Sequence, residues 1–121
     1  MMNTAMMNVK ALRDTKEGRT NPLFMNPHDA RDRDLREGQW VRVHNPQGEI
    51  RAELAFDECL RSGVVAMSHG YGGDWATGLS TVQVTPGVNV NTLSPIGAGS
   101  FDPIGGMSHL TGISVEVTPE N

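Results

Sequence analysis

Two alternating segments joined by a four-residue turn constrain the fold of this chain more than any other feature. Residues 40–44 and residues 49–54 each alternate apolar and polar side chains, so that the apolar ones share one face. Between them, Asn45-Pro46-Gln47-Gly48 has Asn first, Pro second and Gly fourth, which is typical of a type I turn. The sequence therefore predicts a β-hairpin that turns at residues 45–48 and buries one face.

Short strands account for most of the remaining predicted structure. The chain has 121 residues with 14 Gly, 7 Pro and only 5% aromatic residues, which favours one domain of short strands over a helical bundle. Beyond the hairpin, the apolar patterns predict four strands. They lie at residues 23–25, at 64–67 (buried on both faces), at 82–84 and at 113–117.

One short helix is predicted by its capping residues. Asn26 is suited to the N-cap, Pro27 to the first helical position, and Asp29 to the first turn, where the helix dipole favours an anion. We expect this helix to run to about residue 35. Residues 57–61 are compatible with one further helical turn, closed by Ser62-Gly63.

Long irregular segments indicate where a ligand would bind. Residues 68–81 and 86–112 are rich in glycine and turn residues, and loops of more than about 12–15 residues in a compact domain are usually functional or disordered. Residues 1–20 have neither helical nor strand periodicity and are predicted to form an extended arm. Together these features predict a small barrel with one functional rim.

Two motifs within these loops have both a binding and a structural interpretation. The segment His69-Gly70-Tyr71-Gly72-Gly73 offers unobstructed backbone amides to a phosphate or a pterin edge, or it is a plain glycine-rich turn. It matches neither a P-loop nor a dinucleotide-binding turn. The segment Asn89-Val90-Asn91 offers amides that could match a pterin or guanine edge, or it is a polar turn after Pro86-Gly87.

Charge, hydropathy and cysteine content argue against several functional classes. The net charge of −4 lacks the broad basic surface that nucleic acids require, and the longest apolar run, residues 64–67, is far too short to span a membrane. The single cysteine, Cys59, excludes a disulfide within the chain, which favours a reducing, cytoplasmic compartment. The four histidines are scattered and do not predict a metal site. The chain has no nucleophile–base pair of the kind that a small hydrolase needs, so no catalytic residue is predicted.

The order of the motifs resembles the molybdopterin dinucleotide-binding domain at the C-terminus of dimethyl sulfoxide reductase family enzymes. This family also includes formate dehydrogenases and nitrate reductases. The resemblance implies a mainly β fold, a double-psi β-barrel with one or two short helices, over residues 21–121. The matching segments are Asn21–Pro27 with Asp29-Ala30, Glu37–Val43 with Gln47-Gly48, Arg61–Gly70, Asn89–Leu93, Asp102-Pro103 and Val115–Val117.

The resemblance also implies which residues contact a cofactor, bis-molybdopterin guanine dinucleotide with molybdenum or tungsten. The arm opens on residues 3–8, which are similar to the family's pterin-contacting segment. Ala5 and Met7 there replace the aromatic residue and the histidine that the family usually has. The implied cofactor contacts are Thr4, Met6 and Asn8 in the arm, His69 and Gly70, Asn91, and His109.

The resulting functional prediction is a domain that binds and orients the cofactor within a larger oxidoreductase. Because the chain begins on a binding motif and has no place for the metal ligand, we expect a fragment whose partners are the remaining domains of a parent enzyme. A natural stand-alone small subunit is the other possibility. In isolation the chain would be a monomer without bound cofactor, metal or catalytic activity. The alternative is a stand-alone, non-redox double-psi barrel that acts as a binding or interaction module.

Overall fold

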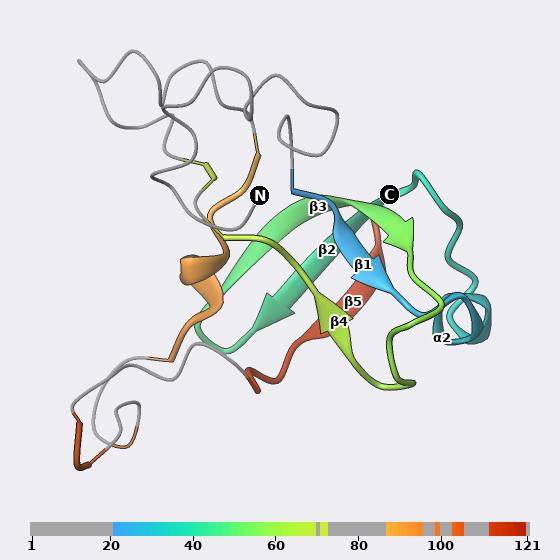
Figure 1. Ribbon diagram of the computed structural model, residues 1–121. Helices are drawn as coiled ribbons and strands as arrows, with labels where there is room; N and C mark the ends of the chain where they lie inside the picture. Colours follow the sequence, from blue (N-terminus) through green and yellow to red (C-terminus); the bar gives the residue numbers. More distant parts are fainter. Residues whose placement is uncertain are drawn as a thin grey trace, which may run out of the picture.

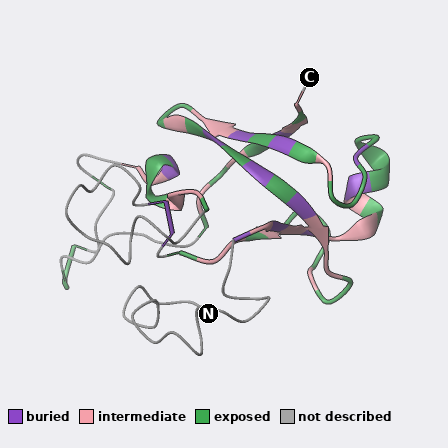
Figure 2. Ribbon diagram, turned by 90° about the horizontal axis from the view of Figure 1, so that it is seen from above, coloured by how far each residue is buried: buried purple, intermediate pink, exposed green. Residues whose placement is uncertain are grey.

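The computed structural model describes residues 21–69, 71–72, 87–95, 99, 103–105 and 112–120 (Figure 1). Within them, five strands form one curled sheet in the order β4-β1-β3-β2-β5, accompanied by two short helices (Figures 1 and 2). The mainly β fold class is confirmed, whereas closure into a double-psi barrel stays a prediction. The elements are β1 (Leu23–Met25), α2 (Pro27–Asp32), β2 (Trp40–Asn45), β3 (Gly48–Phe56), β4 (Val65–Ala66), the 3₁₀ helix η3 (Val90–Leu93) and β5 (Glu116–Pro119).

The predicted hairpin is confirmed at its turn and in its register. β2 and β3 are antiparallel, with Val43 opposite Ile50 and Asn45 opposite Gly48. The Asn45 Oδ1 atom accepts the backbone N–H groups of Gln47 at 2.9 Å and Gly48 at 3.2 Å. The side chain of Asn45 therefore builds the turn, as an Asx residue does at the first position.

Strand β3 occupies the centre of the sheet because both of its edges are paired. It lies antiparallel to β2 and parallel to β1, with Leu23 opposite Leu54. Its apolar residues pack with those of the neighbouring elements in one buried cluster. The buried cluster contains Leu23, Met25, Ala30, Leu35, Val41, Val43, Ile50, Ala52, Leu54, Leu93 and Val117.

Helix α2 begins where the sequence predicts and ends three residues early. Asn26 caps it by accepting the His28 N–H at 2.8 Å. Asp34 then has a φ of 56°, its N–H bonds to the Arg31 carbonyl at 3.1 Å, and the Leu35 N–H bonds to the Ala30 carbonyl at 2.8 Å. This Schellman arrangement ends the helix at Asp32 and turns Leu35 into the core beside Ala30, so the expected extension to residue 35 was wrong.

Strand boundaries were less accurate, because they depend on the length of the partner strand. The segment 23–25 is confirmed as β1. The segment 64–67 reduces to β4, a two-residue strand at the edge of the sheet. Val64 is 47% exposed, so burial on both faces was wrong. The segment 113–117 pairs only from Glu116, opposite His44 near the end of β2, and the paired strand continues to Pro119.

Two other local predictions have different outcomes. Residues 57–61 do not form a helix: the Asp57 side chain accepts the Cys59 N–H at 2.9 Å, and its carbonyl accepts the Leu60 N–H at 3.3 Å, which gives a turn. The predicted strand at 82–84 and the arm at 1–20 lie outside the described residues. Among the elements that the structure describes, no helix is long and apolar enough to cross a membrane.

Candidate functional site

The buried side chain of Asn21 joins the two loop segments that the sequence singled out. Asn21 directly precedes the Pro22 that leads into β1 and is 2% exposed. Its Nδ2 donates to the carbonyl oxygens of Ser68 at 2.9 Å and Val88 at 2.8 Å, and its Oδ1 accepts the Val88 N–H at 2.9 Å. Ser68 immediately precedes His69, and Val88 lies three residues before Asn91, so both motifs depend on one side chain for their placement.

Close backbone packing holds the same two segments together. Gly72 has a φ of +72°, and a Cβ there would clash with the backbone nitrogen of Asn89. A Cβ on Gly87 would lie 2.8 Å from the Cβ of Tyr71. Tyr71 is itself buried, which raises the pKa of its hydroxyl. Gly72 and Gly87 therefore allow the close approach of two backbone segments.

The 3₁₀ helix η3 is held at both of its ends. The Asn89 side chain caps its start by accepting the Asn91 N–H at 3.1 Å. At its other end the Asn45 Nδ2 donates to the Leu93 carbonyl at 2.7 Å, which fixes η3 on the tip of the hairpin. A Cβ on Gly48 would lie 2.8 Å from the Cγ2 of Thr92, so strand and helix are in tight contact. We call residues 68–69, 71–72 and 87–93 the rim.

Of the predicted site residues, the structure describes Asn91 and His69, and both are exposed on the rim. No described residue forms a hydrogen bond with the Asn91 side-chain amide, whereas the amide of Asn89 is used for capping. The structure thus brings the segments of Asn91 and His69 together through Asn21. The other predicted contacts lie outside the described residues: Thr4, Met6, Asn8, Gly70 and His109.

A shallow, largely apolar groove of about 210 Å³ adjoins the rim at the end of η3. It lies between the hairpin tip and the segment that leads into β5, and no sequence motif indicated it. The lining residues are Asn45, Pro46, Gln47, Leu93, Pro95, Gly112, Ile113 and Ser114.

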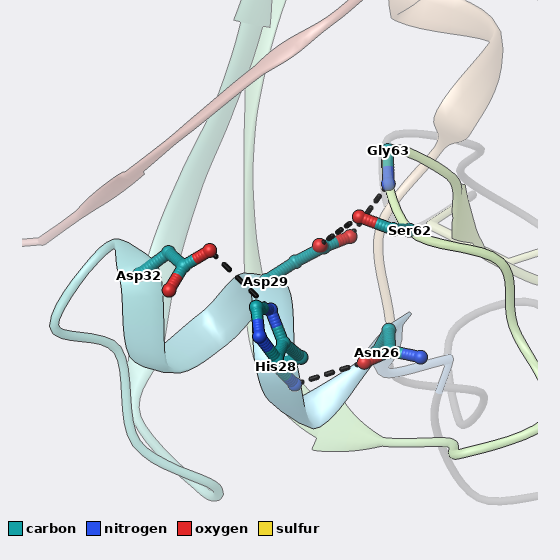
Figure 3. A network of polar contacts seen from close by, with 6 residues as sticks. All are labelled: Asn26, His28, Asp29, Asp32, Ser62 and Gly63. Atoms are coloured by element: carbon teal, nitrogen blue, oxygen red, sulfur yellow. Dashed lines mark hydrogen bonds and ion pairs between the residues drawn. The ribbon is translucent and has the colours of Figure 1, made fainter.

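A polar network at the other end of the sheet has a structural role (Figure 3). Figures 1 and 2 place α2 opposite η3 along the sheet. The Asp29 carboxylate accepts the Ser62 hydroxyl at 2.5 Å and the Gly63 N–H at 2.6 Å, and these bonds lower the pKa of Asp29. They tie the first turn of α2 to the connection before β4. No group of metal-ligating side chains occurs in the described part of the chain.

No functional role was predicted for Asn21 or Asn45, and Asn89 was considered only as part of a segment with a binding or a turn interpretation, yet all three build the rim. Asn21 and Asn45 donate to distant carbonyls: the bonds of Asn21 span 47 and 67 residues, and that of Asn45 spans 48. Local patterns do not carry such information. The one usable signal was the Asn-Pro pair directly before an apolar strand, which places a polar side chain beside the core.

Comparison with known proteins gives both sequence and structural matches. Residues 1–113 match the family described as "Molydopterin dinucleotide binding domain". A tetrathionate reductase chain of Salmonella typhimurium is 31% identical over 60% of this chain and 8% of its own length. A dimethyl sulfoxide reductase and a trimethylamine-N-oxide reductase of Haemophilus influenzae are 33% and 35% identical over 46% and 40% of this chain, and over 7% and 6% of their own lengths.

A solved structure has a similar fold at low sequence identity. Acetylene hydratase from Pelobacter acetylenicus superposes with a TM-score of 0.63 and 21% identity, over 82% of this chain and 14% of that one. This similarity concerns the fold. The chain spans less than a tenth of the length of the curated relatives it matches.

Proposed function

Because this chain belongs to the molybdopterin dinucleotide-binding domain family, we propose that it binds and orients bis-molybdopterin guanine dinucleotide in a larger molybdenum or tungsten oxidoreductase. The family resemblance stated from the sequence is confirmed, and the relatives include dimethyl sulfoxide and tetrathionate reductases. The proposal extends this result to a guanine dinucleotide, to a redox parent enzyme and to that enzyme's remaining domains as partners.

The observation that carries the proposal is the exposed amide of Asn91 on a segment fixed at both ends. A pterin presents several hydrogen-bond donors and acceptors, and each one left unpaired on burial costs about 1–3 kcal/mol. A primary amide can satisfy one donor and one acceptor without adding a charge. Four other asparagines in the described residues bond to the backbone, whereas the exposed Asn91 amide has no partner among those residues.

The rigidity of η3 supports the same assignment. The cap from Asn89 and the bond from Asn45 to Leu93 hold the backbone on either side of Asn91. A binding group held in advance loses little conformational freedom when the ligand arrives. The residues present therefore fit a ligand with an amide-like edge.

In this proposal the protein supplies orientation, and the cofactor when bound supplies the redox chemistry through its metal. Asn91 bonds to the pterin, and the His69 segment forms the adjoining part of the same rim. Further contacts that the resemblance implies complete the proposed site: Thr4, Met6 and Asn8 from the arm at residues 1–20, Gly70, and His109.

Replacing Asn91 by leucine in the full-length enzyme tests the proposal. We expect molybdenum and pterin per chain, and turnover, to fall, because leucine preserves bulk but offers no hydrogen bond. Gln47→Leu is the matched control, since it removes an exposed amide from the hairpin tip. The melting temperature should change little in either variant. Normal cofactor content and turnover in Asn91→Leu would refute the assignment, and a large fall in melting temperature would show that Asn91 is structural.

A further inference from the structure

We propose that Asn21 is a positioning residue for the cofactor site, which holds the His69 and Asn91 segments at a fixed spacing without touching the cofactor. This inference rests on the proposed function. Three observations carry it: Asn21 is buried, its amide bonds to both segments, and the segments are far apart in the chain. The bond to Ser68 spans 47 residues and the bonds to Val88 span 67.

The chemistry at this position requires a neutral primary amide. The carbonyls of Ser68 and Val88 each receive a donor from Nδ2, while the Val88 N–H needs the Oδ1 acceptor. An ionised aspartate has no donor, and serine or threonine has one. Asparagine is the shortest side chain that satisfies all three backbone groups at once. Its loss would remove this partner from part-buried backbone groups of both segments.

A short path leads from Asn21 to the proposed ligand contact. Val88, which accepts from and donates to Asn21, directly precedes Asn89, and the Asn89 side chain caps η3 by accepting the Asn91 N–H. Gly72 and Gly87 leave no free space between the segments. A Cβ on Gly87 would lie 2.5 Å from the Asn21 Oδ1. A shift of Val88 is therefore passed to the backbone of Asn91.

The chain offers a matched control in Asn26. Its Nδ2 donates to the Leu60 carbonyl at 2.7 Å and its Oδ1 accepts the His28 N–H at 2.8 Å. This amide also joins distant segments, but at α2, the end of the sheet away from η3 (Figures 1 and 2). Removing it should lower stability without disturbing the rim.

The experiment compares Asn21→Ala, Asn21→Asp and Asn26→Ala in the full-length enzyme by hydrogen exchange and by molybdenum and pterin content. In both Asn21 variants we expect faster amide exchange in residues 68–69 and 87–93 together, and a loss of cofactor affinity of about tenfold or more, as for residues that orient a binding group. Asn26→Ala should speed exchange near residues 57–63 and retain its cofactor.

The aspartate variant adds a signature that a general loss of stability would not give. Its carboxyl group, once protonated, can donate one of the two lost hydrogen bonds. The exchange rate of the rim relative to the native protein at the same pH should therefore fall as the pH is lowered in Asn21→Asp, but not in Asn21→Ala. If Asn21→Ala does not fold, the pH dependence of exchange in Asn21→Asp relative to the native protein still tests the proposal.

Each result bears on a separate step of the proposal. Native exchange of the rim in both Asn21 variants would overturn the coupling. Faster exchange with full cofactor content would overturn the role in cofactor binding. An equal loss of cofactor in Asn26→Ala would show that stability alone is responsible. The proposed function is judged independently, by the cofactor content of Asn91→Leu.

Discussion

Single asparagine side chains decide how the loops of this domain are placed. In the residues that the structure describes, Asn21, Asn26, Asn45 and Asn89 each use their amides on backbone groups, and Asn91 does not. The sequence identified Asn26 as a cap and Asn45 as a turn residue because those bonds are local. Their second bonds, and all those of Asn21, reach at least 34 residues along the chain and leave no local pattern.

Two glycines with similar backbone conformations should respond differently to alanine. Gly38 and Gly72 have φ values of +78° and +72°, but a Cβ meets nothing within 4 Å at Gly38 and backbone atoms at Gly72. The conformation alone costs an alanine about 1–2 kcal/mol. We therefore expect Gly38→Ala to lower the free energy of unfolding by about that amount, and Gly72→Ala to lower it further. Urea denaturation measures both, and equal losses would contradict the close packing of the rim.

Helices and strands could be predicted where residues close in the sequence define their bounds. They could not be predicted where a strand or side chain far along the chain defines them. The hairpin and the start of α2 depend on alternation, a turn and a cap, and each is confirmed. β4 is cut short at the sheet edge, and β5 begins only where β2 can pair with it. No periodicity indicated η3, since Asn89 and the hairpin tip hold it by single side-chain bonds.

The link between α2 and the segment before β4 should weaken in acid. Hydrogen bonds from Ser62 and Gly63 lower the pKa of Asp29 in the folded state below its ordinary value of 3.8. The stability it contributes is therefore complete above that value and is lost as the pH falls through the lower, folded-state pKa. Asp29→Asn should melt below the native protein at neutral pH, and the gap should close below pH 3.8. A gap that is constant with pH would rule out the carboxylate as its source.

At the scale of the molecule, the sheet separates the end that carries the proposed cofactor contacts from a structural end. The rim and η3 lie at one end and α2 with its Asp29 network at the other (Figures 1 and 2). The sequence could predict that two loops share one rim because both are long and irregular within a small domain of short strands. It could not predict how the two loop segments are held together, which is by the buried Asn21 and by the close contacts at Gly72 and Gly87.

The stability of both ends should depend on the central strand. Leu54 on β3 is 1% exposed and pairs with Leu23 of β1, while β2 lies along the other edge of the strand. Truncating a buried leucine to alanine costs about 2–5 kcal/mol, so Leu54→Ala should destabilise the whole sheet. The exposed neighbour on the same strand, Glu53→Ala, should change stability by less than about 1 kcal/mol. Urea denaturation followed by circular dichroism compares them, and similar losses would show that β3 is not central to stability.

The turn that contains Cys59 makes the domain convenient for labelling. Cys59 is the one cysteine of the chain, it is exposed, and its turn lies just before the Ser62-Gly63 pair that bonds to Asp29 on α2. A maleimide dye attached to this thiol would therefore stand at the structural end of the sheet, away from η3 (Figure 1). A single fluorophore could report on the tumbling of the domain without a cysteine being engineered and without obstructing the rim.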